Sequence, residues 1–247
     1  MRLKLVLAAS AVAALLGAGS CIALVLGVFS VKALSSPGLL VASTLLLPVA
    51  TIVFAAIFFV ELPDKTFIAT LVLQLVEDGR LSLDDAVIDH LPETGLSSEI
   101  TVRQLHQHTS GLADLLAPMR EPMAADPERR WTGPEVIAHL GGPWFAPGAD
   151  YAYSNSNYVL LGMLLERIYH NPFPKVVERH LLRPLGLDET GVLLDPDAPL
   201  LITPSWASAF GTSGNMYSSV SDLLEWGLSL YGGRVLQHET LSQMLAF

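Results

Sequence analysis

Apolar residues follow two patterns along the chain, continuous near the start and periodic afterwards. The stretches Leu5–Phe29 and Leu39–Val60 are almost wholly apolar, and Pro48 interrupts only the second. Each is long enough to cross a bilayer, which takes about 20 residues, and a membrane helix tolerates proline. The sequence therefore predicts one or two membrane spans in residues 1–60. The alternative for Leu39–Val60 is a buried core segment.

The charges divide the chain at the same place. Residues 1–60 contain no Asp or Glu, and their only charges are Arg2, Lys4 and Lys32. The basic N-terminus is typical of a signal peptide or a signal anchor, and the length of the first apolar stretch favours an anchor. We therefore expect a membrane protein with a hydrophobic head, residues 1–60, and a globular domain, residues 61–247. One crossing would place this domain outside the cytoplasm, whereas two would return it there.

The globular part is acidic. It carries all 24 acidic residues and 11 of the 14 basic ones, a net charge of −13. Nucleic-acid binding needs clustered Lys and Arg, so this balance argues against a nucleic-acid partner. Cys21 is the only cysteine, so no Cys-based metal site or internal disulfide is expected.

Apolar residues at helical spacing, together with capping residues, predict several helices after residue 60. Gly79 is the expected stop for the first, and Thr101 is the expected cap of the second. Four prolines within 117–134 indicate a surface loop. Strand candidates are few, so the domain should be mainly helical. The expected helices cover Pro63–Glu77, TVRQLHQ from Thr101, Ser156–Tyr169, VVERHLLRPLGL, SDLLEWGLSLY capped by Ser219 or Ser221, and a short helix near the end.

Five segments in order resemble one family of enzymes. They read DKTFIATLVLQLVEDGRLSLDDAV, ITVRQLHQHTSGLADL, FAPGADYAYSNSNYVLLGMLLERI, HLLRPLGLDETG and SGNMYSSVSDLLEW. Together they are similar to the class C β-lactamase and D-alanyl-D-alanine carboxypeptidase family of serine hydrolases, over residues 62–247. The resemblance implies an α+β fold of the β-lactamase/transpeptidase type, with mostly the helical subdomain present and an incomplete antiparallel sheet.

The resemblance also implies a site. The family transfers an acyl group from an amide to a serine and hydrolyses the product, without a cofactor or metal. By resemblance, Lys65 is the lysine of Ser-x-x-Lys, Tyr153 the base or proton shuttle, and Asn155 the amide donor to the substrate carbonyl. The alternative for Tyr-Ser-Asn is a helix cap supplied by Ser154 or Asn155. The segment that contains His108 is a structural turn in this family.

Two departures from the family pattern bear on activity. Leu62 stands three residues before Lys65, where the nucleophilic serine belongs. The Lys-Thr-Gly motif that the family carries on an edge strand does not occur, and that strand would lie beyond residue 247. We therefore expect a C-terminally truncated domain that is catalytically impaired, a pseudoenzyme.

Three functions are compatible with these observations. The first is an impaired family member whose ligand is a cell-wall peptide or a β-lactam-like small molecule. The second is a non-catalytic, membrane-anchored module that binds peptidoglycan peptides. The third is an active serine hydrolase, if a frame or start-site error has altered the sequence upstream of Asp64.

Overall fold

Residues 65–193 and 202–245 are the part of the chain that the computed structural model describes. They belong to a compact unit that spans Glu61–Phe247. The first described element is a helix over residues 65–77, which buries Phe67 and Leu71. Gly79 ends it with a positive φ of 66°, while the N–H of Arg80 bonds back to the carbonyl of Leu75. This is the glycine-terminated helix that the sequence predicts.

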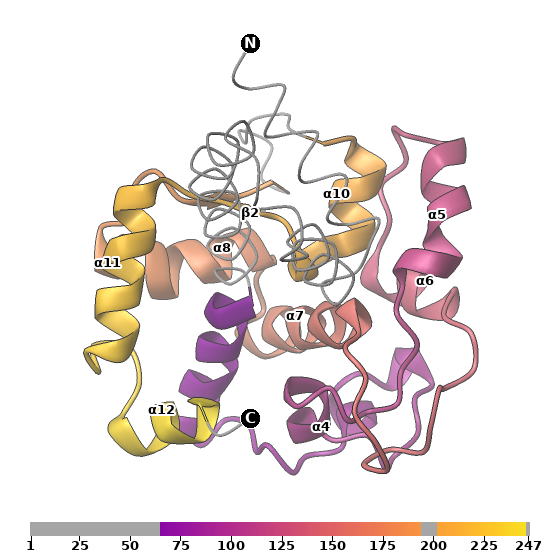
Figure 1. The fold of residues 1–247 in the computed structure, drawn as a ribbon, viewed down its shortest axis with the longest axis horizontal. Helices are drawn as coiled ribbons and strands as arrows, with labels where there is room; N and C mark the ends of the chain where they lie inside the picture. The colour runs from indigo at the N-terminus through magenta and orange to yellow at the C-terminus, as the bar shows by residue number, and fades with distance from the viewer. Residues whose placement is uncertain (1–64, 194–201, 246–247) are drawn as a thin grey trace, which may run out of the picture. The chain divides into compact units, whose positions relative to one another are not determined.

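The remaining elements are helices and two short strands, and α7 lies at the centre of the ribbon (Figure 1). In chain order they are α3 (Val87–His90), η2 (Pro92–Thr94), α4 (Val102–His106), α5 (Leu116–Ala125), α6 (Gly133–Ala138), α7 (Asn155–Tyr169), α8 (Phe173–Val177), η3 (Glu178–Leu182), α9 (Arg183–Leu185), β1 (Gly191–Val192), α10 (Pro204–Phe210), η4 (Gly211–Ser213), β2 (Met216–Tyr217), α11 (Val220–Tyr231) and α12 (His238–Leu245).

Three predicted helix starts are confirmed by their caps. Thr101 forms a capping box with Gln104 at the start of α4. Ser154 caps α7 by accepting a hydrogen bond from the N–H of Ser156. Ser219, one of two candidates, caps α11. Each cap satisfies an N–H group that the helix itself leaves unpaired.

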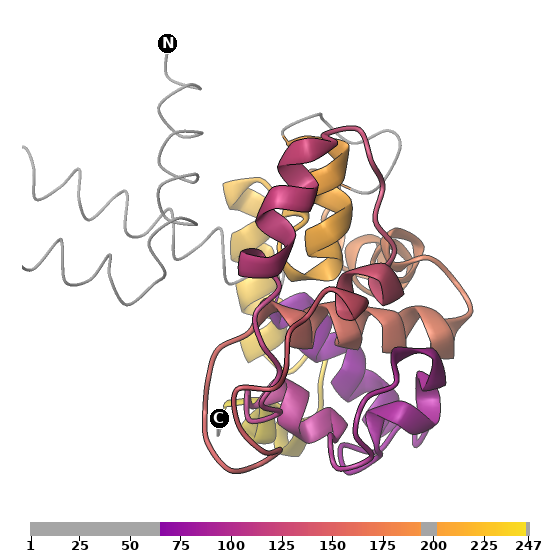
Figure 2. The same ribbon diagram turned by 90° about the vertical axis from the view of Figure 1, so that its right-hand side faces the viewer.

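The prediction of a surface loop over 117–134 is wrong for residues 117–125 and 133–134, which are helical, and holds only for residues 126–132. The helices α5 and α6 occupy most of this segment, and Figures 1 and 2 show α5 beside α10. Met119 and Met123 of α5 are fully buried, and this tertiary burial outweighs the proline inside the helix. Pro134 lies in the first turn of α6, where proline has no N–H bond to lose.

The core is built on α7. Nine residues of this helix are buried, among them Leu160, Leu161, Leu164 and Leu165. It packs against α4, α8 and η4, and it lies at the centre of the ribbon in Figure 1. The expected apolar helix over 156–169 is therefore confirmed, and its position fixes where the preceding residues lie.

Strand structure is sparse in the described ranges. β1 and β2 form one antiparallel pair, with Gly191 opposite Tyr217 and Val192 opposite Met216. The mainly helical character that the sequence predicts is therefore confirmed for this part of the chain.

The predicted membrane spans Leu5–Phe29 and Leu39–Val60 lie outside the described residues. Among residues 65–193 and 202–245, no helix combines the length and apolar character that a bilayer crossing requires.

Candidate active site

Lys65 is the first described residue and lies in the first turn of the helix over 65–77. Its Nζ atom is 5.9 Å from the ring centroid of Tyr153 and 5.9 Å from that of Tyr158. These distances are within the range of a cation–π interaction. Leu62, at the predicted nucleophile position, lies outside the described residues.

Tyr153 and Asn155 flank the N-cap of α7. The hydroxyl of Tyr153 donates a hydrogen bond to Oδ1 of Asn155, at 3.0 Å, and the Tyr153 side chain is 42% exposed. Lys65, Tyr153 and Asn155 are thus brought together as the family pattern requires. Their catalytic roles stay a prediction. The capping alternative is compatible with this arrangement, because Ser154 caps the helix while its two neighbours form the site.

Asp114 holds Asn155 in place, and no motif in the sequence points to this residue. Its Oδ2 atom accepts hydrogen bonds from the backbone N–H of Asn155, at 2.7 Å, and from Asn155 Nδ2, at 2.9 Å. Its Oδ1 atom accepts from the N–H of Leu116, at 2.8 Å. Asp114 and Asn155 are 41 residues apart, so no local pattern in the sequence links them.

The ring of His108 lies beside the ring of Tyr153, with centroids 4.5 Å apart. Its Nδ1 atom accepts hydrogen bonds from the N–H of Ser154, at 3.2 Å, and from Asn157 Nδ2, at 3.0 Å. Burial and, secondarily, the charge of Lys65 lower the pKa of His108 to about 4. A nitrogen that accepts a backbone N–H carries no proton, so the ring is neutral and its role is to support the loop. This agrees with the interpretation of the segment as a structural turn.

The chain around His108 presents Tyr153 through backbone pairing. The carbonyl of His108 accepts from the N–H of Ala152, at 3.0 Å, and the carbonyl of Gly111 accepts from the N–H of Trp144, at 2.8 Å. Gly111 has a φ of +76°, and a Cβ there would collide with the carbonyl oxygen of Phe145. Only glycine combines this conformation with so close an approach.

A cavity of about 510 Å³ lies elsewhere, between α6, α7 and η4. Trp131, Val159, Met163 and Thr212 are among its lining residues, but none of the three predicted site residues is. The Lys65 cluster is the candidate active site, because it holds the polar groups that acyl transfer requires.

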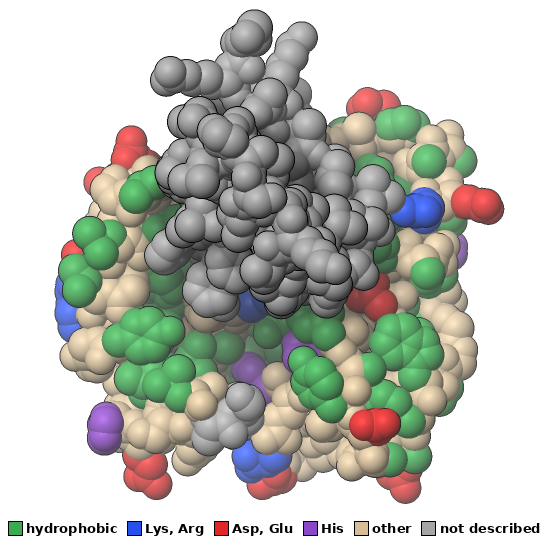
Figure 3. Space-filling model, viewed as in Figure 1, with side chains coloured by type: hydrophobic (Ala, Val, Ile, Leu, Met, Phe, Trp, Pro, Cys, Tyr) green, Lys and Arg blue, Asp and Glu red, His purple; other side chains and the backbone are tan. Residues whose placement is uncertain are grey.

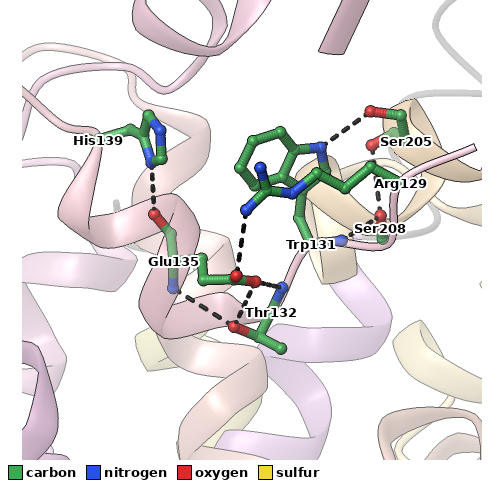
Figure 4. Close-up of polar contacts among 7 residues, drawn as sticks. All are labelled: Arg129, Trp131, Thr132, Glu135, His139, Ser205 and Ser208. Carbon is green, nitrogen blue, oxygen red and sulfur yellow. Dashed lines mark hydrogen bonds and ion pairs between the residues drawn. The ribbon is translucent and has the colours of Figure 1, made fainter. Parts of the chain in front are cut away.

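The polar contacts beside this cavity are structural (Figure 4). Trp131 donates from Nε1 to Ser205 Oγ and from its backbone N–H to Ser208 Oγ, both at 2.8 Å. Thr132 and Glu135 form the capping box of α6. These bonds connect the start of α6 to α10.

The described residues contain no group of three His, Cys, Asp or Glu side chains that could hold a metal ion. On the face in Figure 3, acidic side chains are spread around the edge of the described surface, and basic ones are few.

Comparison with known proteins gives one family. The Beta-lactamase family model matches residues 64–247. Protein flp of Staphylococcus aureus is 28% identical over 184 residues, which cover 66% of this chain and 36% of flp. The chain therefore spans about a third of the length of this curated relative.

Two solved structures are similar in fold. A D-stereospecific amidohydrolase from Streptomyces is 32% identical, with a TM-score of 0.64 over 72% of this chain and 62% of that protein. A D-amino acid amidase from Ochrobactrum anthropi, complexed with D-phenylalanine, is 25% identical, with a TM-score of 0.63 over 72% of this chain and 57% of the amidase.

Proposed function

The chain belongs to the Beta-lactamase family, and on that premise we propose that it binds small peptides or β-lactam-like compounds without forming an acyl-enzyme. The carrying observation is the cluster of Lys65, Tyr153 and Asn155, in which a cation, a phenol and an amide meet at a partly exposed surface. Such groups suit a ligand that has a carbonyl and a negative charge. The amidohydrolase and the amidase act, by their names, on related D-configured compounds.

We propose that no acyl-enzyme forms because Leu62 stands where the family has its serine. A helical register places residue 62 one turn before Lys65, and a leucine has no atom that can attack a carbonyl. Loss of the nucleophile costs about 10⁶ in rate in a well-studied serine protease. Tyr153 and Lys65 would then recognise the ligand and would not activate a serine.

We also propose that residues 1–60 anchor the protein in a membrane and that residues 61–247 lie outside the cytoplasm. The apolar stretches support an anchor. The basic N-terminus supports this location with Leu5–Phe29 as the single crossing, because a second crossing would return the domain to the cytoplasm.

The test is binding measured beside covalent labelling on the full chain. We expect an N-acetylated D-alanyl-D-alanine peptide to bind reversibly by calorimetry, and a fluorescent penicillin to leave no covalent band. Tyr153→Phe should weaken peptide binding by about fivefold, the size of one lost hydrogen bond. Tyr231→Phe is the matched control, because Tyr231 is 64% exposed on α11, and it should bind like the unmodified chain.

Two outcomes would overturn the proposal. A covalent penicillin band that disappears in Lys65→Ala would identify an active serine hydrolase with another nucleophile. Failure of the peptide to bind at millimolar concentration would exclude the recognition role.

A further inference from the structure

The carboxylate of Asp114 serves three N–H donors at the edge of the site. Oδ1 accepts from the N–H of Leu116, and Oδ2 accepts from both the backbone and the side chain of Asn155, at 2.7 and 2.9 Å. The side chain of Asp114 is half-buried. Charge-assisted bonds of this kind are stronger than those between neutral groups.

The charge on Asp114 decides which way the amide of Asn155 points. An ionised carboxylate only accepts hydrogen bonds, so the Nδ2 side of Asn155 must face it. The Oδ1 side then faces Tyr153, whose hydroxyl donates at 3.0 Å. This orientation leaves the second Nδ2 hydrogen of Asn155 for a ligand carbonyl.

The backbone around Asp114 is tied to the same turn. The carbonyl of Ala113 accepts hydrogen bonds from Ser154 Oγ, at 3.1 Å, and from Ser156 Oγ, at 2.7 Å. With the two bonds between Asp114 and Asn155, four hydrogen bonds join residues 113–114 to residues 154–156. These four bonds therefore hold the Asp114 carboxylate and the Asn155 amide in fixed positions relative to each other.

We propose that Asp114 is the positioning residue of this site. It fixes the amide of Asn155 so that one end receives the Tyr153 hydroxyl and the other is presented to the carbonyl of an acyl or peptide ligand. The ligand part of this inference rests on the proposed function, whereas the orientation of the amide does not. Asp114 also caps the first turn of α7, so the test must separate positioning from simple stabilisation.

The first arm of the test does not need a ligand. In the ¹⁵N-labelled full chain, the Asn155 side-chain NH₂ signals are identified by their loss in Asn155→Ala. We expect one of the two protons to be shifted downfield and protected from exchange with water, and both effects to be lost in Asp114→Ala. Asp114→Asn is the second variant, because a single amide oxygen cannot serve the donors that two carboxylate oxygens serve. Unchanged Asn155 signals in both variants would overturn the proposal.

The second arm is a double-mutant cycle on affinity for the N-acetylated D-alanyl-D-alanine peptide. Asp114→Ala and Asn155→Ala should each weaken binding by about tenfold, and the double variant by about the same tenfold, because both changes remove one coupled unit. Asp126→Ala is the control, since Asp126 also accepts two backbone N–H bonds but lies in the exposed turn after α5. Additive losses of about a hundredfold in the double variant would show that Asp114 acts independently of Asn155, and would overturn the positioning role. If the peptide does not bind the unmodified chain, the proposed function fails and the first arm alone decides the role of Asp114.

Discussion

At the scale of single residues, His108 shows how a titratable side chain beside a cation is kept neutral. Its φ of 55° is unusual for a residue other than glycine. The ring centroid lies 4.5 Å from that of Tyr153, with the two planes tilted by 32°, and Nδ1 accepts two hydrogen bonds. Protonation of Nδ1 would break both bonds and place a second positive charge next to Lys65. The neutral ring thus supports the loop that carries Tyr153.

This neutrality predicts a pH dependence of stability. The pKa values of His106 and His108 are both lowered, chiefly by burial, from 6.5 to about 4. Above pH 6.5 neither the folded nor the unfolded form is protonated there. Between about pH 6.5 and pH 4 the unfolded chain binds protons that the folded chain does not. The free energy of unfolding should therefore fall with decreasing pH, by up to about 1.4 kcal/mol per pH unit for each histidine.

Urea unfolding at pH 7, 6 and 5 measures this slope, and the window above pH 5 limits the contribution of carboxylates. His108→Gln should be less stable than the unmodified chain at pH 7 but should show a shallower slope. An NMR titration of His108 with a midpoint near pH 6.5 would contradict the prediction.

At the scale of elements, α7 and η4 pack at a distance that only glycine permits. Gly162 of α7 faces Thr212 of η4, and a Cβ on Gly162 would overlap the Thr212 side chain. Thr212 cannot easily turn away, because its hydroxyl donates a 2.6 Å hydrogen bond to the carbonyl of Tyr158. The same contact therefore helps to set α7, and with it the turn that carries Asn155.

Gly162→Ala should destabilise the protein by about 1–3 kcal/mol, because overpacking outweighs the better helix propensity of alanine. Gly227→Ala is the matched control within α11, where an added Cβ meets nothing within 4 Å. That change should stabilise by about 0.5–1 kcal/mol. Chemical denaturation of both variants measures the difference, and equal stabilities would show that α7 can shift away from η4.

At the scale of the whole molecule, distant parts of the sequence meet at the helix that carries Lys65. Trp226 of α11 stacks on Phe67, with ring centroids 4.0 Å apart, and donates from Nε1 to Thr66 Oγ1 at 3.0 Å. The N–H of Gln237 also bonds to the Glu77 side chain, at 2.8 Å. Figure 1 shows α11 and α12 near this first helix. The C-terminal helices thus stabilise the helix of the site.

The apolar residues 1–60 lead to a prediction about membrane association of the full chain. If residues 1–60 are a membrane anchor, the full chain should pellet with membranes and need detergent for release, whereas a chain beginning at Glu61 should stay in the supernatant. Fractionation followed by immunoblotting measures both, and a high-salt wash controls for loose surface binding. A full chain that stays in the supernatant without detergent would show that Leu39–Val60 is a core segment.

Local patterns in the sequence determined where the main helices of this protein form. Helical periodicity and caps at Thr101, Ser154 and Ser219 depend on residues within one turn of each other, so the main helices could be predicted. The ordered family segments likewise placed Lys65, Tyr153 and Asn155 correctly in one cluster.

The tertiary structure decided what depends on distant partners. Residues 117–125 are helical because Met119 and Met123 become buried, and no local pattern records that burial. Asp114 gains its role only when folding brings it to Asn155, 41 residues away. Hydrogen bonds and burial between distant segments form only in the folded chain, which is why the contacts that hold Asn155 could not be predicted from the sequence, although the proximity of Lys65, Tyr153 and Asn155 could.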